Sequence, residues 1–156
     1  SIKRCNDAIY YGELNKHNAV RVAEVRFLRA YYFFQLVQQF GDVALATEFI
    51  TAPVTSYERT PASEVYTFII DEMKTALAAL PATAANRVNQ RVVNHYLSLV
   101  YLTRGYETYG SPSDFQSSVE YATAAINNQG LTLPFDGKTG IFFPGNEKNA
   151  EIIFFV

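Results

Sequence analysis

The residues of this chain that could bind a nucleotide or a metal ion are not arranged in the patterns that such binding needs. Gly137-Lys138-Thr139 has the form of the end of a phosphate-binding loop, but Thr132 stands where that loop requires its first glycine. His17 and His95 lie far apart, and neither is followed four residues later by a second histidine or a carboxylate. The sequence therefore predicts no cofactor and no metal site.

Residues that could support catalysis also lack partners. Asp71 and Glu72 are adjacent, so on a helix their side chains point about 100° apart and cannot work together as acid and base. Ser111 and Ser113 lie in a sequence typical of the start of a helix, without a G-x-S-x-G motif and without a histidine nearby. We therefore expect a protein that is not an enzyme.

Aromatic side chains offer a third kind of chemistry, which is stacking on a sugar ring. Aromatic residues make up 15% of the chain, and most of the phenylalanines recur at helical spacing, as expected of a hydrophobic core. Tyr106 and Tyr109 lie where a predicted helix ends, beside the loop at residues 110–113. They are our candidate ligand-binding residues, because a tyrosine at a loop rim can present its ring to a sugar. The alternative is that both rings pack on the helix end with their hydroxyls in water.

Composition sets the broad class of the protein. Of the 156 residues, 49% are apolar and 18% are charged, which predicts one folded domain with a sizeable core. The net charge of −2 lacks the basic excess that nucleic acid binding requires. A single cysteine, Cys5, cannot form an internal disulfide. The longest apolar stretch, residues 27–40, is interrupted by an arginine and by glutamines, so no membrane span is predicted.

Hydrophobic periodicity predicts five helices, and these must position any site. They cover about residues 2–11, 18–39, 60–80, 88–109 and 111–128. The second is apolar nearly all round, which is typical of a helix in the middle of a bundle. Thr60 and Pro61 read as the N-cap and first residue of the third helix. Residues 42–59 form a linker of about 18 residues, long enough to suggest an ordered loop with a function.

The order of these helices indicates two hairpins with a tetratricopeptide-like pattern. The second hairpin has Leu97, Tyr101 and Gly105 at the spacing of that repeat. Its second helix continues with Phe115, Ser118, Ala122 and Ala125. In the first hairpin, Leu28 and Tyr32 are expected to face Tyr66 and Ala76. The fold class that we predict is therefore all-α, with antiparallel helix hairpins in a tetratricopeptide-like superhelix, a loop-rich C-terminal segment and one short terminal strand.

Two longer motifs resemble the SusD/RagB family of nutrient-binding outer-membrane lipoproteins. Residues 24–37 and 40–45, which read EVRFLRAYYFFQLV and FGDVAL, are similar to the signature helix of that family and the turn after it. Residues 59–61 (RTP), together with residues 64–72 further on, are similar to its second motif, and residues 149–154 (NAEIIF) to its N-x-E-I-I-F strand. The resemblance covers the whole chain and is most specific over residues 24–45.

The resemblance implies a helical scaffold that, in full-length members, docks a TonB-dependent (SusC-like) outer-membrane transporter and binds an oligosaccharide or a peptide. It also implies a lipid anchor at the outer membrane, although the fragment itself is expected to be soluble. Cys5 is not the lipidated cysteine, because Ile2-Lys3-Arg4 lacks the small apolar residues of a lipidation motif. No ligand-contacting residue is transferred from the family, whose ligand contacts come largely from other segments and vary between members.

Domain organisation is expected to follow the change in composition near Gly130. Residues 1–130 are predicted to form the helical scaffold, and residues 131–156 a loop-rich segment and a strand that lead into a missing ligand-binding region. The run Glu151–Val156 is apolar on both faces of the predicted strand, so we interpret the chain as a fragment. The alternative function is a tetratricopeptide adaptor that grips a peptide. Such adaptors line their groove with basic residues, in which the helices here are poor.

The helical pattern places the charged residue Arg29 on an apolar helix face, so we expect its side chain to be buried. It shares a helix face with Val22, Val25, Tyr32 and Leu36, and an unpaired buried guanidinium would be costly. We expect Asp71 to pair with it, and Glu72 as the second choice. The alternative is that Arg29 extends its charged head into water.

Overall fold

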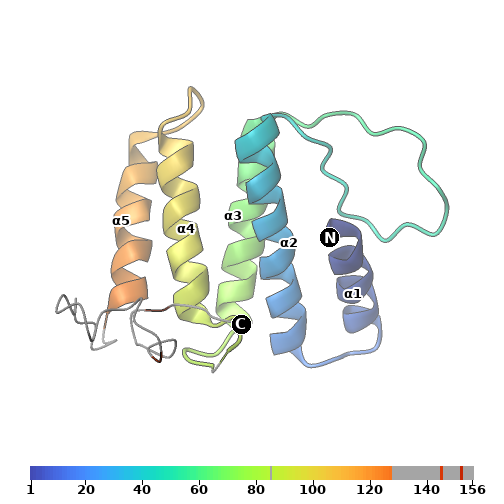
Figure 1. The fold of residues 1–156 in the computed structure, drawn as a ribbon, viewed down its shortest axis with the longest axis horizontal. Coiled ribbons are helices and arrows are strands. Elements are labelled where there is room, and N and C mark those ends of the chain that lie inside the picture. Colours follow the sequence, from blue (N-terminus) through green and yellow to red (C-terminus); the bar gives the residue numbers. More distant parts are fainter. Residues whose placement is uncertain (85, 128–144, 146–151, 153–156) are drawn as a thin grey trace.

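The computed structural model describes residues 1–84, 86–127, 145 and 152, and over this part of the chain it is built from five helices. They are α1 (Ile2–Leu14), α2 (Ala19–Phe40), α3 (Ala62–Ala79), α4 (Gln90–Gly105) and α5 (Pro112–Ile126). Figure 1 shows them side by side in chain order, with a long loop reaching from the end of α2 past α1. The predicted all-α class is confirmed, whereas residues 153–156 of the expected strand and nearly all of residues 131–156 lie outside the described residues.

Two antiparallel hairpins form the scaffold, and α2 lies inside it. The α2–α3 pair and the α4–α5 pair each pack along their length, α3 also packs on α4, and α2 touches α1, α3 and α4. The largest fully buried side chains are Phe33, Ile69, Met73 and Leu97, so the core runs through α2, α3 and α4. The face of α2 that meets α3 differs from our expectation. Leu28 and Tyr32 are exposed at its edge, because the stripe with Phe27, Ala30 and Phe34 takes the buried position.

The second hairpin has the close helix crossing that the repeat pattern predicts. A Cβ atom on Gly105 would lie 2.9 Å from Cε1 of Phe115, so a larger residue at position 105 would force the Phe115 ring to move. Further along the pair, the Ser118 hydroxyl donates to the carbonyl of Ser98 at 3.0 Å. α4 is shorter than predicted: it begins after Asn89, which caps it by accepting the N–H of Val92 at 3.2 Å, and it ends at Gly105.

The start of α3 is capped from an unexpected place. Thr60, which the sequence suggested as the N-cap, instead pairs its backbone with Val43 in an isolated antiparallel bridge. The helix begins at Ala62, whose N–H donates to Oδ1 of Asp42 at 2.8 Å. Asp42 lies at the other end of the loop, so the same contact caps the helix and closes the loop.

Candidate functional site

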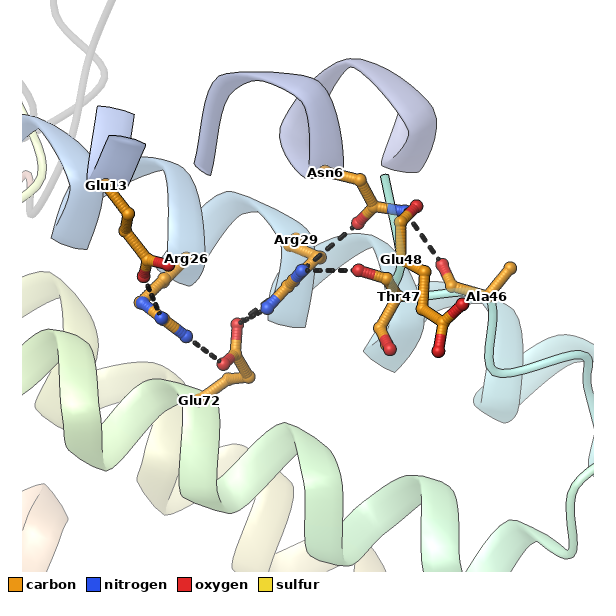
Figure 2. A network of polar contacts seen from close by, with 8 residues as sticks. All are labelled: Asn6, Glu13, Arg26, Arg29, Ala46, Thr47, Glu48 and Glu72. Atoms are coloured by element: carbon orange, nitrogen blue, oxygen red, sulfur yellow. Dashed lines mark hydrogen bonds and ion pairs between the residues drawn. The ribbon is translucent and has the colours of Figure 1, made fainter. Parts of the chain in front are cut away.

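A buried ion pair joins α2 and α3 at the centre of the described structure. Arg29 is only 6% exposed, and its guanidinium donates twice to Oε2 of Glu72, at 3.0 and 2.6 Å. The remaining guanidinium nitrogen, Nη1, donates to Oδ1 of Asn6 and to the carbonyl of Thr47, both at 3.1 Å. Figure 2 shows these groups converging on the guanidinium from α1, α3 and the loop that follows α2. The burial that we predicted for Arg29 is observed, and the alternative of a solvated head is wrong.

The predicted partner of Arg29 was off by one residue. Asp71 is exposed and shares its side of α3 with exposed Thr67 and Lys74, whereas Glu72 is 7% exposed. One residue turns a helix by about 100°, so only one of two adjacent carboxylates can face α2. Our second choice, Glu72, is the residue that does so.

The network extends further along α2 to a second arginine. Arg26 donates to the other carboxylate oxygen of Glu72, Oε1, at 2.5 Å, and to Oε1 of Glu13 on α1, also at 2.5 Å. Glu72 is thus shared by two arginines, which together donate three hydrogen bonds to its two carboxylate oxygens. Sequence reasoning missed Arg26 and the α1 residues, although the spacing of three between Arg26 and Arg29 places both on one face.

The same network fixes the first part of the α2–α3 loop, which we define as residues 41–61. Asn6 donates its amide hydrogens to the carbonyls of Ala46 and Glu48, at 3.0 and 3.2 Å. With the bond from Arg29 to the Thr47 carbonyl, three successive loop residues are held by side chains of α1 and α2. Backbone carbonyls that are satisfied in this way make a loop an ordered element.

The base of the α2–α3 loop is closed by a second set of contacts. Val43 and Thr60 exchange both backbone hydrogen bonds, at 3.2 and 2.9 Å. Arg59 donates to the carbonyl of Asp42 at 2.8 Å and to the carbonyl of Phe40 at 3.1 Å, which satisfies an acceptor left over at the end of α2. The residues of the two motifs that carried the resemblance therefore meet at the base of one loop, and we take this loop as the candidate functional element.

The two tyrosines singled out from the sequence pack on different helices. Tyr106 is 80% exposed, and its ring packs edge-to-face on that of Phe115 on α5, with the ring centroids 5.1 Å apart. Tyr109 is 38% exposed and lies 6.1 Å from the ring of Tyr66 on α3. Burial, together with the nearby Glu107 carboxylate, raises the pKa of Tyr109 to about 12, so its hydroxyl stays protonated at neutral pH. Tyr106 is the one that offers most of its ring to a ligand.

The two histidines and the phosphate-loop-like residues considered from the sequence do not add a metal or phosphate site within the described residues. His17 lies in the turn between α1 and α2, and half-buried His95 has its pKa lowered by burial and by the nearby Arg91. Within the described residues, no group of three His, Cys, Asp or Glu side chains is placed to hold a metal ion. Gly137–Thr139 lie outside those residues. None of the described helices is both long and apolar enough to cross a membrane.

Comparison with known proteins gives consistent matches. A SusD-like family model, described as starch-binding and associating with the outer membrane, matches residues 11–102. SusD-like protein P2 of Formosa agariphila is 34% identical over 128 residues, which are 80% of this chain and 24% of that protein. The chain thus spans about a quarter of the length of the curated relative it matches.

Solved structures match the fold. A SusD superfamily protein from Bacteroides fragilis has a TM-score of 0.81 at 22% identity, over 98% of this chain and 34% of its own. A structure named as a laminarin-binding SusD-like protein has a TM-score of 0.61 at 28% identity, over 71% of this chain and 23% of its own.

Proposed function

Because this chain belongs to the SusD-like family, we propose that it forms the helical scaffold of a non-enzymatic glycan-binding component of nutrient uptake at the outer membrane. The observation that carries the proposal is the match of the family model to residues 11–102, which include α2, α3 and the whole α2–α3 loop. That family is described as starch-binding and as associating with the outer membrane. The laminarin-binding relative supports a glucan as the ligand class.

The proposed partners are an oligosaccharide and a TonB-dependent, SusC-like transporter, with a peptide as the alternative ligand. In this proposal residues 1–130 are the scaffold, residues 131–156 lead into the ligand-binding region, and a lipid anchor holds the full-length protein at the outer membrane. Tyr106 is the stronger of the two tyrosine candidates for contact with a sugar, because its ring is 80% exposed and edge-packed on Phe115. Tyr109, which packs on Tyr66, would contribute only the outer edge of its ring.

Docking to a transporter can be tested by co-purification. The purified, tagged chain is mixed with detergent-solubilised outer membranes of the bacterium that encodes it, and the recovered proteins are identified by mass spectrometry. We expect a TonB-dependent β-barrel transporter to be enriched at least about tenfold over its recovery with an unrelated tetratricopeptide protein carrying the same tag. Recovery of other proteins without such a transporter would favour the adaptor function instead.

A further inference from the structure

A hollow of about 380 Å³ lies between the first turn of α1 and the outer part of the α2–α3 loop. It is lined by Lys3, by residues 50–54 and by Tyr57. In Figure 1 this part of the loop passes beside the first turn of α1 before the chain returns to α3. A hollow of this size is at the lower end of the range typical of small-molecule sites.

The walls of the hollow combine one aromatic ring, that of Tyr57, with one charged hydrogen-bond donor, Lys3. Tyr57 is 48% exposed, so much of its ring faces outward. The Lys3 ammonium lies 2.9 Å from Oδ2 of Asp7, which offsets the charge of the lysine without itself lining the hollow. An ammonium has three donors, so Lys3 can keep this bond and still donate to a ligand.

The loop is held in place immediately before it reaches the hollow. Residues 46–48 are fixed by Asn6 and Arg29, as described above. The next residue, Phe49, stacks on Tyr10 of α1 with ring centroids 4.2 Å apart and planes within 5°, and Tyr11 meets it edge-on at 5.2 Å. A wall fixed before the ligand arrives loses less conformational entropy on binding.

We propose that this hollow is a subsite for one uncharged sugar unit of an oligosaccharide, stacked on Tyr57 and hydrogen-bonded by Lys3. The inference deepens the proposed function and rests on it. Sugar hydroxyls can accept hydrogen bonds from the Lys3 ammonium. An anionic ligand is disfavoured, because Asp7 neutralises Lys3 and the loop adds exposed Glu48 and Glu58.

The test is an NMR titration of the isotope-labelled chain with maltotriose and with laminaritriose as separate probes. We expect at least one probe to shift the backbone amide signals of Lys3, Thr51 and Tyr57, with a Kd of about 1 mM. Tyr57→Ala should weaken that binding about tenfold, and Lys3→Met about threefold. Tyr32→Ala, which removes a comparably exposed tyrosine on α2, is the matched control and should leave the Kd unchanged.

Each other outcome counts against the subsite. An unchanged Kd in both Tyr57→Ala and Lys3→Met would overturn it, because neither wall would then contribute. Shifts gathered around Tyr106 and Tyr109 alone would overturn the subsite while leaving glycan binding by the chain in place. If neither probe shifted any signal up to about 20 mM, the subsite would be overturned and the proposed glycan binding of this chain would lose its support as well.

Discussion

Replacing Glu72 with alanine is expected to lower the free energy of unfolding by about 3–5 kcal/mol, the usual cost of removing one partner from a buried ion pair. The reason is that Arg29, at 6% exposure, would keep its bonds to Asn6 and Thr47 but lose its counter-charge in a place that water does not reach. Arg26 would also lose one of its two carboxylate partners. Urea unfolding followed by circular dichroism measures the change.

Asp71→Ala is the matched control for that measurement. It removes a carboxylate from the adjacent residue of α3, but from the exposed side. We expect it to change the free energy of unfolding by less than about 0.5 kcal/mol, as is usual for surface substitutions. A loss below about 1 kcal/mol for Glu72→Ala, or similar losses for the two variants, would show that the buried pair does not stabilise the scaffold.

Replacing Asp114 with alanine is expected to cost about 2–3 kcal/mol at neutral pH. The Asp114 carboxylate is nearly fully buried and pairs with Arg104 through two hydrogen bonds, one of them at 3.1 Å. It also accepts the N–H of Ser111 at 3.0 Å and so completes the capping box of α5. The cost is below that for Glu72, because Arg104 is partly exposed and can turn to water. Ser113→Ala, in the same turn but exposed, is the control.

The effect of Asp114→Ala should depend on pH in a predictable direction. Burial alone would raise the pKa of this carboxyl, but the hydrogen bonds from Arg104 and from the Ser111 N–H bring its pKa below the ordinary value of 3.8. The carboxylate therefore stabilises the folded state fully at pH values above 3.8, and that contribution is lost as the pH falls through the lower folded pKa. The difference between wild type and variant should thus shrink in strong acid. A difference that stays constant between neutral pH and about pH 2 would contradict this account.

Local signals predicted the two ends of α2 and the start of α5 well, whereas the local N-cap signal of Thr60 was wrong, because Thr60 pairs with Val43 instead. The two ends of α2, at Asn18 and Gly41, follow from a capping side chain and from a glycine with φ of 66°, and the capping box of α5 was visible in Ser111 and Asp114. These features depend on residues close together in the chain. The burial of Arg29 was predicted from an apolar face that includes Tyr32, but Tyr32 is exposed, and the buried stripe of α2 is the one with Phe27, Ala30 and Phe34.

The partners across elements could not be read from the sequence in the same way. The choice between Asp71 and Glu72 depends on the rotation of α3 relative to α2, which is set by how the two helices pack. The two bonds from Asn6 to the loop join residues that are 40 and 42 positions apart in the sequence. Asp42 and Ala62, which form the cap of α3, are 20 positions apart. No periodic pattern encodes such contacts, so the anchored loop became apparent only in three dimensions.

The proposed binding of glycans by this chain can be tested by affinity electrophoresis. The chain is run in native gels with and without soluble starch or laminarin, beside serum albumin as a reference for gel sieving. We expect at least one of the two glucans to slow the chain relative to albumin, because each polymer presents many copies of the sugar unit to a weak site. Unchanged relative mobility in both gels, for a chain whose circular dichroism shows the helical fold, would contradict it.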